Sequence, residues 1–245
     1  MMNALRRLLA MTALVCVLPA QATTWGTDTI RDPVTGASCR VSTPASAGSY
    51  VYQWPEKYDQ VFWPLTDPMG IWLCVDSGFA AFIGDIGLDG GEKGAIAAFL
   101  RGAPRLPRNA SLAQKLERLE AVYALRRLPD DARARILRAL AFQYEADGQQ
   151  AKADALRAQA GALMDARLRD PGMPPDLRLQ YLFVTANYAR ERGDAADADR
   201  RMALLATPLA DAAQDDKLKD YAEYLATLLA SARAIVPGGV LAPDP

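Results

Sequence analysis

The chain of 245 residues contains no histidine, and this absence excludes several kinds of site. Catalysis by Ser-His-Asp or Cys-His groups needs an imidazole, so neither arrangement can form. Structural zinc takes four cysteine or histidine ligands, and only three cysteines are present. A Gly-x-Ser-x-Gly turn and a glycine-rich phosphate loop are also missing. We therefore expect no metal, no cofactor and no enzymatic activity. Paired carboxylates, as glycosidases use, remain the one catalytic alternative, and the carboxylates near the aromatic cluster are Glu56, Asp59, Asp67 and Asp85.

A strong excess of positive charge is absent as well. The sequence has 28 Lys and Arg against 29 Asp and Glu, which gives a formal net charge of -1. Proteins that bind nucleic acid need a basic face that neutralises phosphates and releases their counterions. The charge balance therefore predicts no nucleic-acid partner.

Long apolar runs are scarce, and the one at the N-terminus has the order of a secretory signal. Arg6-Arg7 precede an apolar run over 8–18, and Ala20-Gln21-Ala22 has the small-x-small pattern of a cleavage site. The run is shorter than the roughly 20 residues that a membrane-spanning helix needs. We therefore predict a signal peptide over residues 1–22 and no stable membrane span. The mature chain would lie in the periplasm of a Gram-negative bacterium, with a net charge of -3 because two arginines are removed.

Composition divides the mature chain near residue 91. Residues 23–91 hold a dense aromatic segment, and short runs over 49–53 and 71–75 are typical of strands. Residues 92–236 are rich in Ala, Leu, Arg and Asp and read as helices, and 237–245 is a Pro- and Gly-containing tail that we expect to be flexible. Capping residues, apolar spacing and Gly or Pro breaks predict helices over 111–125, 131–146, 149–169, 175–192, 194–205 and 218–235.

Two of the predicted helix pairs resemble each other. Their shared positions are Ala141, Tyr144, Gly148 and Ala153 in the first pair, and Ala186, Ala189, Gly193 and Ala198 in the second. Small residues let the two helices of a hairpin approach closely, as in tetratricopeptide repeats. The period is longer than the roughly 34 residues of that repeat. The alternative is an ordinary antiparallel helical bundle.

If the pairs stack as repeats, one strip of side chains should face the concave side. Positions at i, i+4 and i+7 share a helical face. The strip would consist of Arg138, Phe142 and Glu145 in the first pair and Phe183, Asn187 and Arg190 in the second. Such a strip binds peptides or partner helices, so we expect protein partners in the cell envelope. The alternative for Phe142 and Phe183 is core packing.

The aromatic segment allows a second kind of ligand. Large rings stack on sugars, and a face of this type would consist of Trp54, Tyr58, Trp63 and Trp72. The same rings also fill protein cores, and composition cannot separate the two roles. Binding of cell-wall carbohydrate is therefore the alternative to a protein-interaction or scaffold function.

The segments 49–55 and 71–85 resemble an uncharacterised bacterial family. The motifs that carry the resemblance are Ser49-Tyr50-Val51-Tyr52-Gln53-Trp54-Pro55 and, most specifically, Cys74-Val75-Asp76-Ser77-Gly78-Phe79-Ala80-Ala81-Phe82-Ile83-Gly84-Asp85. Members of that family combine a zinc-ribbon-like N-terminal module, with two Cys-Pro-x-Cys-Gly turns, and tetratricopeptide-like helices. The resemblance implies an α+β protein with a small β-rich ribbon-like module followed by an all-α helical-hairpin domain.

This chain departs from the family at the metal ligands. Asp32, Thr35 and Ser77 stand at three of the four ligand positions, and only Cys74 remains. The glycines of both turns, Gly36 and Gly78, are kept. The mature chain has two cysteines, and an exported protein meets an oxidising compartment, so we predict a disulfide between Cys39 and Cys74 in place of the metal. Two buried free thiols or an intermolecular bridge are the alternatives.

Overall fold

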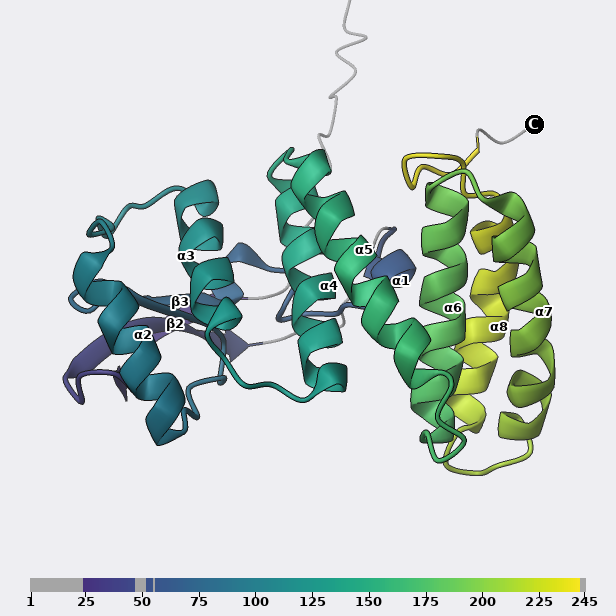
Figure 1. The fold of residues 1–245 in the computed structure, drawn as a ribbon, viewed down its shortest axis with the longest axis horizontal. Helices are drawn as coiled ribbons and strands as arrows, with labels where there is room; N and C mark the ends of the chain where they lie inside the picture. Colours follow the sequence, from purple (N-terminus) through teal and green to yellow (C-terminus); the bar gives the residue numbers. More distant parts are fainter. Residues whose placement is uncertain (1–23, 47–51, 55, 243–245) are drawn as a thin grey trace, which may run out of the picture.

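The computed structural model describes residues 24–46, 52–54 and 56–242, and the expected signal peptide lies outside these ranges. Two small antiparallel sheets lie at one end of the molecule with α2 (Gly90–Gly102) and α3 (Leu112–Ala124). At the other end lie α6 (Pro175–Glu191), α7 (Ala195–Ala212) and α8 (Lys219–Arg233). Between the two ends stand α4 (Asp130–Ala146) and α5 (Gln150–Arg167) (Figure 1). The predicted α+β layout is confirmed at this level.

Each sheet is one hairpin with a glycine in its turn. Strands β1 (Thr24–Arg31) and β2 (Ser38–Ser46) pair antiparallel, as do β3 (Ile71–Cys74) and β4 (Phe79–Phe82). Gly36 and Gly78 have φ of +76° and +80°, which L side chains rarely adopt, and this explains why glycine is present in both turns. In each turn the glycine N–H donates to the carbonyl four residues earlier, at 2.8 Å and 2.7 Å. The two turns thus share one geometry.

The predicted disulfide is present and joins the two hairpins. Cys39 of β2 and Cys74 of β3 are bonded, with their Cα atoms 5.3 Å apart. Around the bond lies an apolar cluster to which the sheets and the two nearest helices contribute. Its buried members are Cys39, Val41, Trp72, Cys74, Phe79, Ala81, Ile96 and Val122. Since α2 and α3 supply Ile96 and Val122, helical residues pack within the aromatic module, and the expected boundary near residue 91 falls at the start of α2.

Two capping boxes start the helices of this module. Asp89 accepts a hydrogen bond from the Glu92 N–H and Glu92 bonds back to the Asp89 N–H, which begins α2. Ser111 and Gln114 make the same reciprocal pair at α3, where the sequence predicted a cap. Capping satisfies N–H groups that the first helical turn leaves free.

The remaining helices form two hairpins and a final helix. Hairpins α4–α5 and α6–α7 turn at Gly148 and Gly193, whose φ values are +78° and +83°. The residue after each glycine donates its N–H to the carbonyl five residues earlier, at 2.8 Å in both hairpins. Equivalent alanines, fully buried where the helices of a hairpin meet, are Ala141 and Ala153 in the first hairpin and Ala186 and Ala198 in the second. The small residues thus lie where the sequence pattern required close approach.

Two local expectations differ from the structure. Helix α7 continues to Ala212 through Pro208, although the sequence predicted an end at Leu205. Proline cannot donate to the carbonyl of Leu204, but Leu204 is 54 % exposed, so water can satisfy that oxygen. Tyr52 and Gln53 are not in a strand, and the rest of the strand expected at 49–53 lies outside the described residues.

The start of the expected C-terminal tail is hydrogen-bonded to the helices. The N–H of Gly238 donates to the carbonyl of Glu191 at 2.9 Å, and that of Ala242 donates to Ala234 at 2.7 Å. Ile235 and Leu241 form an isolated bridge. Residues 236–242 therefore fold back against α6 and α8.

Within the described ranges, no helix combines the length and the apolar character needed to cross a bilayer.

Candidate functional site

The residues that follow the strand expected at 49–53 pack against the helical hairpins rather than against the β hairpins. Helix α1 (Glu56–Asp59) lies between α4 and α6, where Figure 1 shows it enclosed by the helices. Tyr58 is 1 % exposed, and its ring lies 5.6 Å from that of Tyr188, centroid to centroid. We call residues 56–65 the inserted segment, because they fill the face that the two hairpins would otherwise leave open.

A buried ion pair holds the inserted segment. The carboxylate of Asp59 is fully buried and accepts from Nε and Nη2 of Arg157 at 3.0 Å and 2.7 Å. The Tyr188 hydroxyl donates to the same carboxylate at 2.7 Å, and Glu145 also pairs with Arg157. Burial alone would disfavour the charged guanidinium, but Asp59 outweighs it and raises the pKa of Arg157. Burial also raises the pKa of Tyr188, which therefore acts as a hydrogen-bond donor.

Both hairpins also bind the backbone of the inserted segment. Arg138 of α4 donates to the carbonyl of Asp59 at 3.1 Å, and Asn187 of α6 donates to that of Tyr58 at 3.1 Å. Gln143 donates to the carbonyl of Leu65 at 2.8 Å. Hydrogen bonds to carbonyl oxygens hold a chain without reading its side chains.

The structure divides the predicted strip into three groups. Arg138, Asn187 and Glu145 belong to the contacts around the inserted segment. Phe183 is fully buried in the helical core. Phe142 and Arg190 are partly exposed, and Arg190 pairs with Asp199.

The four aromatic residues proposed as a ligand face do not lie together on one surface. Tyr58 is in the helical core, and Trp72 is buried beside the disulfide with its indole N–H on the carbonyl of Ser42 at 2.7 Å. Trp54 packs against the helical core. Trp63 lies 6.1 Å from the ring of Trp25.

A hollow of about 440 Å³ lies beside the inserted segment and brings two predicted residues together. It opens between the segment, strand β4 and helices α4 and α6. Its lining includes Arg138 from the predicted strip and Trp63 from the predicted aromatic set. The other lining residues are Gln60, Val61, Phe62, Pro64, Leu65, Phe82, Ile83, Asp85, Arg135, Ile136 and Gln180. A volume of this size, with apolar walls and a few polar groups, is typical of ligand sites.

Two groups in this hollow have unused hydrogen-bonding capacity. The indole N–H of Trp63 is buried and has no partner within the described part of the chain. Arg135 is exposed, and none of the described residues forms an ion pair or hydrogen bond with its guanidinium. A buried donor without a partner is costly, so a ligand that accepts from the Trp63 indole is favoured. Acceptor groups such as carboxylates and carbonyls suit both donors.

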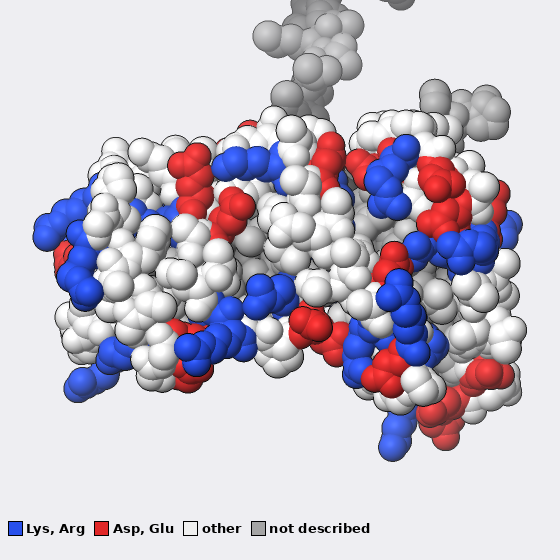
Figure 2. Space-filling view, viewed as in Figure 1, with Lys and Arg blue, Asp and Glu red and all other residues white. Residues whose placement is uncertain are grey.

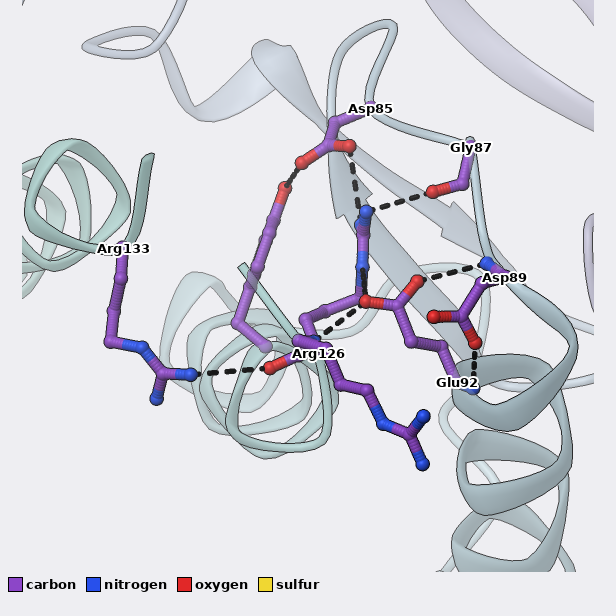
Figure 3. Close-up of polar contacts among 8 residues, drawn as sticks. Asp85, Gly87, Asp89, Glu92, Arg126 and Arg133 are labelled. Carbon is purple, nitrogen blue, oxygen red and sulfur yellow. Dashed lines mark hydrogen bonds and ion pairs between the residues drawn. The ribbon is translucent and has the colours of Figure 1, made fainter. Parts of the chain in front are cut away.

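The acidic edge of the hollow is fixed by a network of hydrogen bonds (Figure 3). Asp85 accepts from Tyr123 at 2.7 Å and from Arg126 at 3.2 Å, and Arg126 also reaches Glu92 at 3.2 Å. Although burial opposes the charged form of Glu92, the N–H groups of Arg127 and Asp89 and the Arg126 guanidinium lower its pKa. Asp85, Glu92 and Arg126 neutralise one another, so we assign this network to stability.

The other carboxylates considered for catalysis also have structural partners. Asp67 caps the short 3-10 helix at 68–70 and accepts from the Trp25 indole at 3.1 Å. Glu56 accepts from the N–H of Gln53 at 2.7 Å. Asp59 is closed off by Arg157 and Tyr188. These contacts account for the three carboxylates without a reacting pair.

Metal ligands do not gather in the described ranges. Among these residues, no group of three or more Cys, Asp or Glu side chains is placed to hold an ion. At the first of the two turns, Asp32 accepts from the N–H of Val34 at 2.8 Å and of Thr35 at 3.3 Å. At the second, Ser77 bonds within its own turn and accepts from Phe79 at 3.0 Å. Asp32 and Ser77 thus stabilise their own turns.

Comparison with family models, curated proteins and solved structures found no match to this chain. Sequence reasoning found Arg138, Asn187 and Trp63 but missed Gln143, Arg157 and Tyr188. Gln143 and Tyr188 occupy equivalent positions in the two hairpins, each two residues after the shared alanine. This repeated position is the sequence signal that would have added both residues to the predicted strip.

Proposed function

We propose that the chain is an exported, non-enzymatic interaction protein that binds a peptide segment of an envelope partner. In this proposal, two tetratricopeptide-like hairpins and the inserted segment together form the binding site, and the hollow at Arg138 and Trp63 receives the partner. The observation that carries the proposal is the convergence of these two residues with the free guanidinium of Arg135 in one hollow. Export is supported by the N-terminal sequence and by the disulfide, which suits an oxidising compartment.

The chemistry of the hollow indicates what the partner segment should contain. Phe62, Trp63 and Leu65 supply apolar surface, while Arg135 and Arg138 supply positive charge. Arginine prefers carboxylates that it can bind through two N–H groups. We therefore expect a segment that places an acidic residue next to an apolar or aromatic one.

Site-specific photocrosslinking tests this proposal in the exported full-length chain. A benzoylphenylalanine in place of Phe62, an aromatic residue that lines the hollow, should form adducts with an envelope protein and leaves Arg135 and Arg138 in place. The matched control is the same group at Arg192, which is exposed at the end of α6. Adducts at position 62 should disappear when Trp63 is changed to Ala. Equal adducts at 62 and 192, or none at 62, would contradict the proposal.

Binding of cell-wall carbohydrate is a second candidate, and Trp63 alone supports it. Its ring lies in the hollow with the amides of Gln60 and Gln180, a combination that also suits sugars. Titration with cell-wall oligosaccharides should then change the tryptophan fluorescence of the native chain but not of a Trp63→Phe variant. No spectral change in the native chain would exclude this candidate.

A further inference from the structure

The stretch that runs from α2 through the loop into the start of α3, which we call the basic connection, carries many basic residues. Between Glu92 and Glu117 the sequence has five basic residues and no acidic one. The basic residues are Lys93, Arg101, Arg105, Arg108 and Lys115. Figure 2 shows blue side chains, with little red, at the end of the molecule that carries the β hairpins and α2. This local excess differs from the near-zero charge of the whole chain.

A buried arginine lies beneath this connection. Arg118 of α3 is 6 % exposed and donates to the carbonyls of Gly78 at 2.9 Å and Pro104 at 2.6 Å. Its guanidinium also lies 5.8 Å from the centre of the Phe99 ring. None of the carboxylates in the described ranges forms an ion pair with it. Burial lowers the pKa of Arg118, which reflects the cost of a desolvated charge that lacks a counter-charge.

Arg118 lines a hollow of about 450 Å³ between the two turns and the basic connection. Two further arginines, Arg101 and Arg105, are exposed and line the same hollow, and Asp76 is the acidic side chain in its lining. Within the described part of the chain, neither Arg101 nor Arg105 has a hydrogen bond or ion pair. The hollow therefore carries three guanidinium groups against one carboxylate.

The acids on the other side of Arg118 do not neutralise it. Arg118 also lines a hollow of about 650 Å³ that contains Glu117. Glu117 is mostly exposed and pairs with Lys152 at 3.8 Å. A buried charge without a counter-charge is strongly destabilising unless a partner is supplied. An anion in the hollow would provide that partner.

We propose that the hollow formed by Arg101, Arg105 and Arg118 binds a phosphate group. Guanidinium forks match the oxygens of phosphate through paired N–H bonds, and two of the three forks are exposed and unpaired. The phosphate can be a free ion or the headgroup of an anionic lipid, since both present the same oxygens. This site is distinct from the peptide site at Arg138 and Trp63 and does not depend on it.

Calorimetric titration of the mature chain with inorganic phosphate, at constant ionic strength, tests the proposal. The test variant is Arg101→Gln with Arg105→Gln, whose side chains are exposed and whose loss should leave the fold intact. The control is Arg192→Gln with Arg233→Gln, which removes the same charge from exposed positions on the helical end. We expect the test variant to bind phosphate at least about tenfold more weakly, because it loses the charge-assisted hydrogen bonds of two guanidinium groups. The control should bind within about twofold of the native chain.

Vesicles separate the two sources of phosphate. If the ligand is a lipid headgroup, phosphatidylglycerol vesicles should bind the native chain, inorganic phosphate should compete, and the test variant should lose binding. If the ligand is a soluble phosphate, only the calorimetric signal should depend on Arg101 and Arg105. The proposal is overturned if the native chain does not bind inorganic phosphate, or if both variants lose affinity equally. Vesicle binding without binding of the free ion would also overturn it, because a flat basic face would explain that result.

Discussion

In the helical hairpins Arg157 is 2 % exposed and meets the carboxylate of Asp59, whereas at the β end Arg118 is 6 % exposed and donates its hydrogen bonds to two backbone carbonyls. Both arginines are held by residues far away in the sequence, so both fix the fold. They differ in whether the charge is neutralised inside the chain. A buried pair is closed to ligands, while a buried charge without a counter-charge favours an anion from outside. The face between the two helical hairpins is therefore occupied by the inserted segment, whereas the hollow formed by Arg101, Arg105 and Arg118 is open to a ligand.

Removal of the Asp59 carboxylate should have the largest effect on stability, because it leaves Arg157, like Arg118, buried without its main counter-charge. The variant Asp59→Leu leaves Arg157 buried without its main partner and also breaks the bond to Tyr188. We expect a loss of about 5 kcal/mol in the free energy of unfolding, measured by urea denaturation. The double variant with Arg157→Leu should recover most of this loss, since apolar side chains replace buried pairs well. A loss below about 2 kcal/mol in the single variant would mean that Glu145 is a sufficient partner.

The two ends also differ in covalent cross-linking. The disulfide lies at the β end, between its two hairpins. The bonded residues, Cys39 and Cys74, are 35 positions apart, and a loop of this size contributes about 4 kcal/mol in the chain-entropy model. The variant Cys39→Ser with Cys74→Ser should lose about that amount of stability. Thermal denaturation with and without reductant measures the loss. Reductant should destabilise the native chain and leave the double variant unchanged; an unaffected native chain would contradict the bond.

Gly36 and Gly78 allow the role of Arg118 to be separated from backbone strain. Both have positive φ, but a Cβ at Gly36 would meet nothing within 4 Å, while one at Gly78 would lie 2.3 Å from Nη1 of Arg118. We expect Gly36→Ala to cost about 1–2 kcal/mol from strain alone. Gly78→Ala should cost about 1–2 kcal/mol more and should weaken phosphate binding, because Arg118 must move. Equal losses of stability in the two variants would show that Arg118 is free to adapt.

The helices could be predicted from sequence because their signals are local. The cap at Ser111 and the glycines at Gly148 and Gly193 act within one turn of the chain. The register of the two hairpins also placed Arg138 and Asn187 on the face that holds the inserted segment. No local pattern could show what fills that face, since Asp59 and Arg157 are 98 positions apart.

The β end was harder to predict for the same reason. Strand β1 has mostly polar residues and none of them is buried, so it lacks the alternation that marks a half-buried strand, and β2 alternates only over its first four residues. Trp72 and Tyr58 belong to one aromatic segment but pack in different cores, because the chain between them crosses from the helices to the sheets. The composition of the segment therefore predicted one aromatic ligand face. That face does not form, because the chain carries Tyr58 and Trp72 to different parts of the molecule.

At the helical end one buried carboxylate, Glu191, is not fully neutralised by the basic residues near it. Its titration should have the smallest of the expected effects on stability. Burial, and then the charge of Asp154, raise the pKa of Glu191 to about 6. The folded chain therefore holds a proton on Glu191 that the unfolded chain releases at lower pH, so stability should fall as the pH rises from about 4.5 to 6. The expected decrease is about 1 kcal/mol, after allowance for screening by solvent. Glu191→Gln should remove this decrease, whereas Glu223→Gln, at an exposed position of α8, should keep it. Urea denaturation at pH 4.5 and 7 measures both variants, and parallel pH profiles for native chain and Glu191→Gln would show that the arginines of the helical end neutralise Glu191 after all.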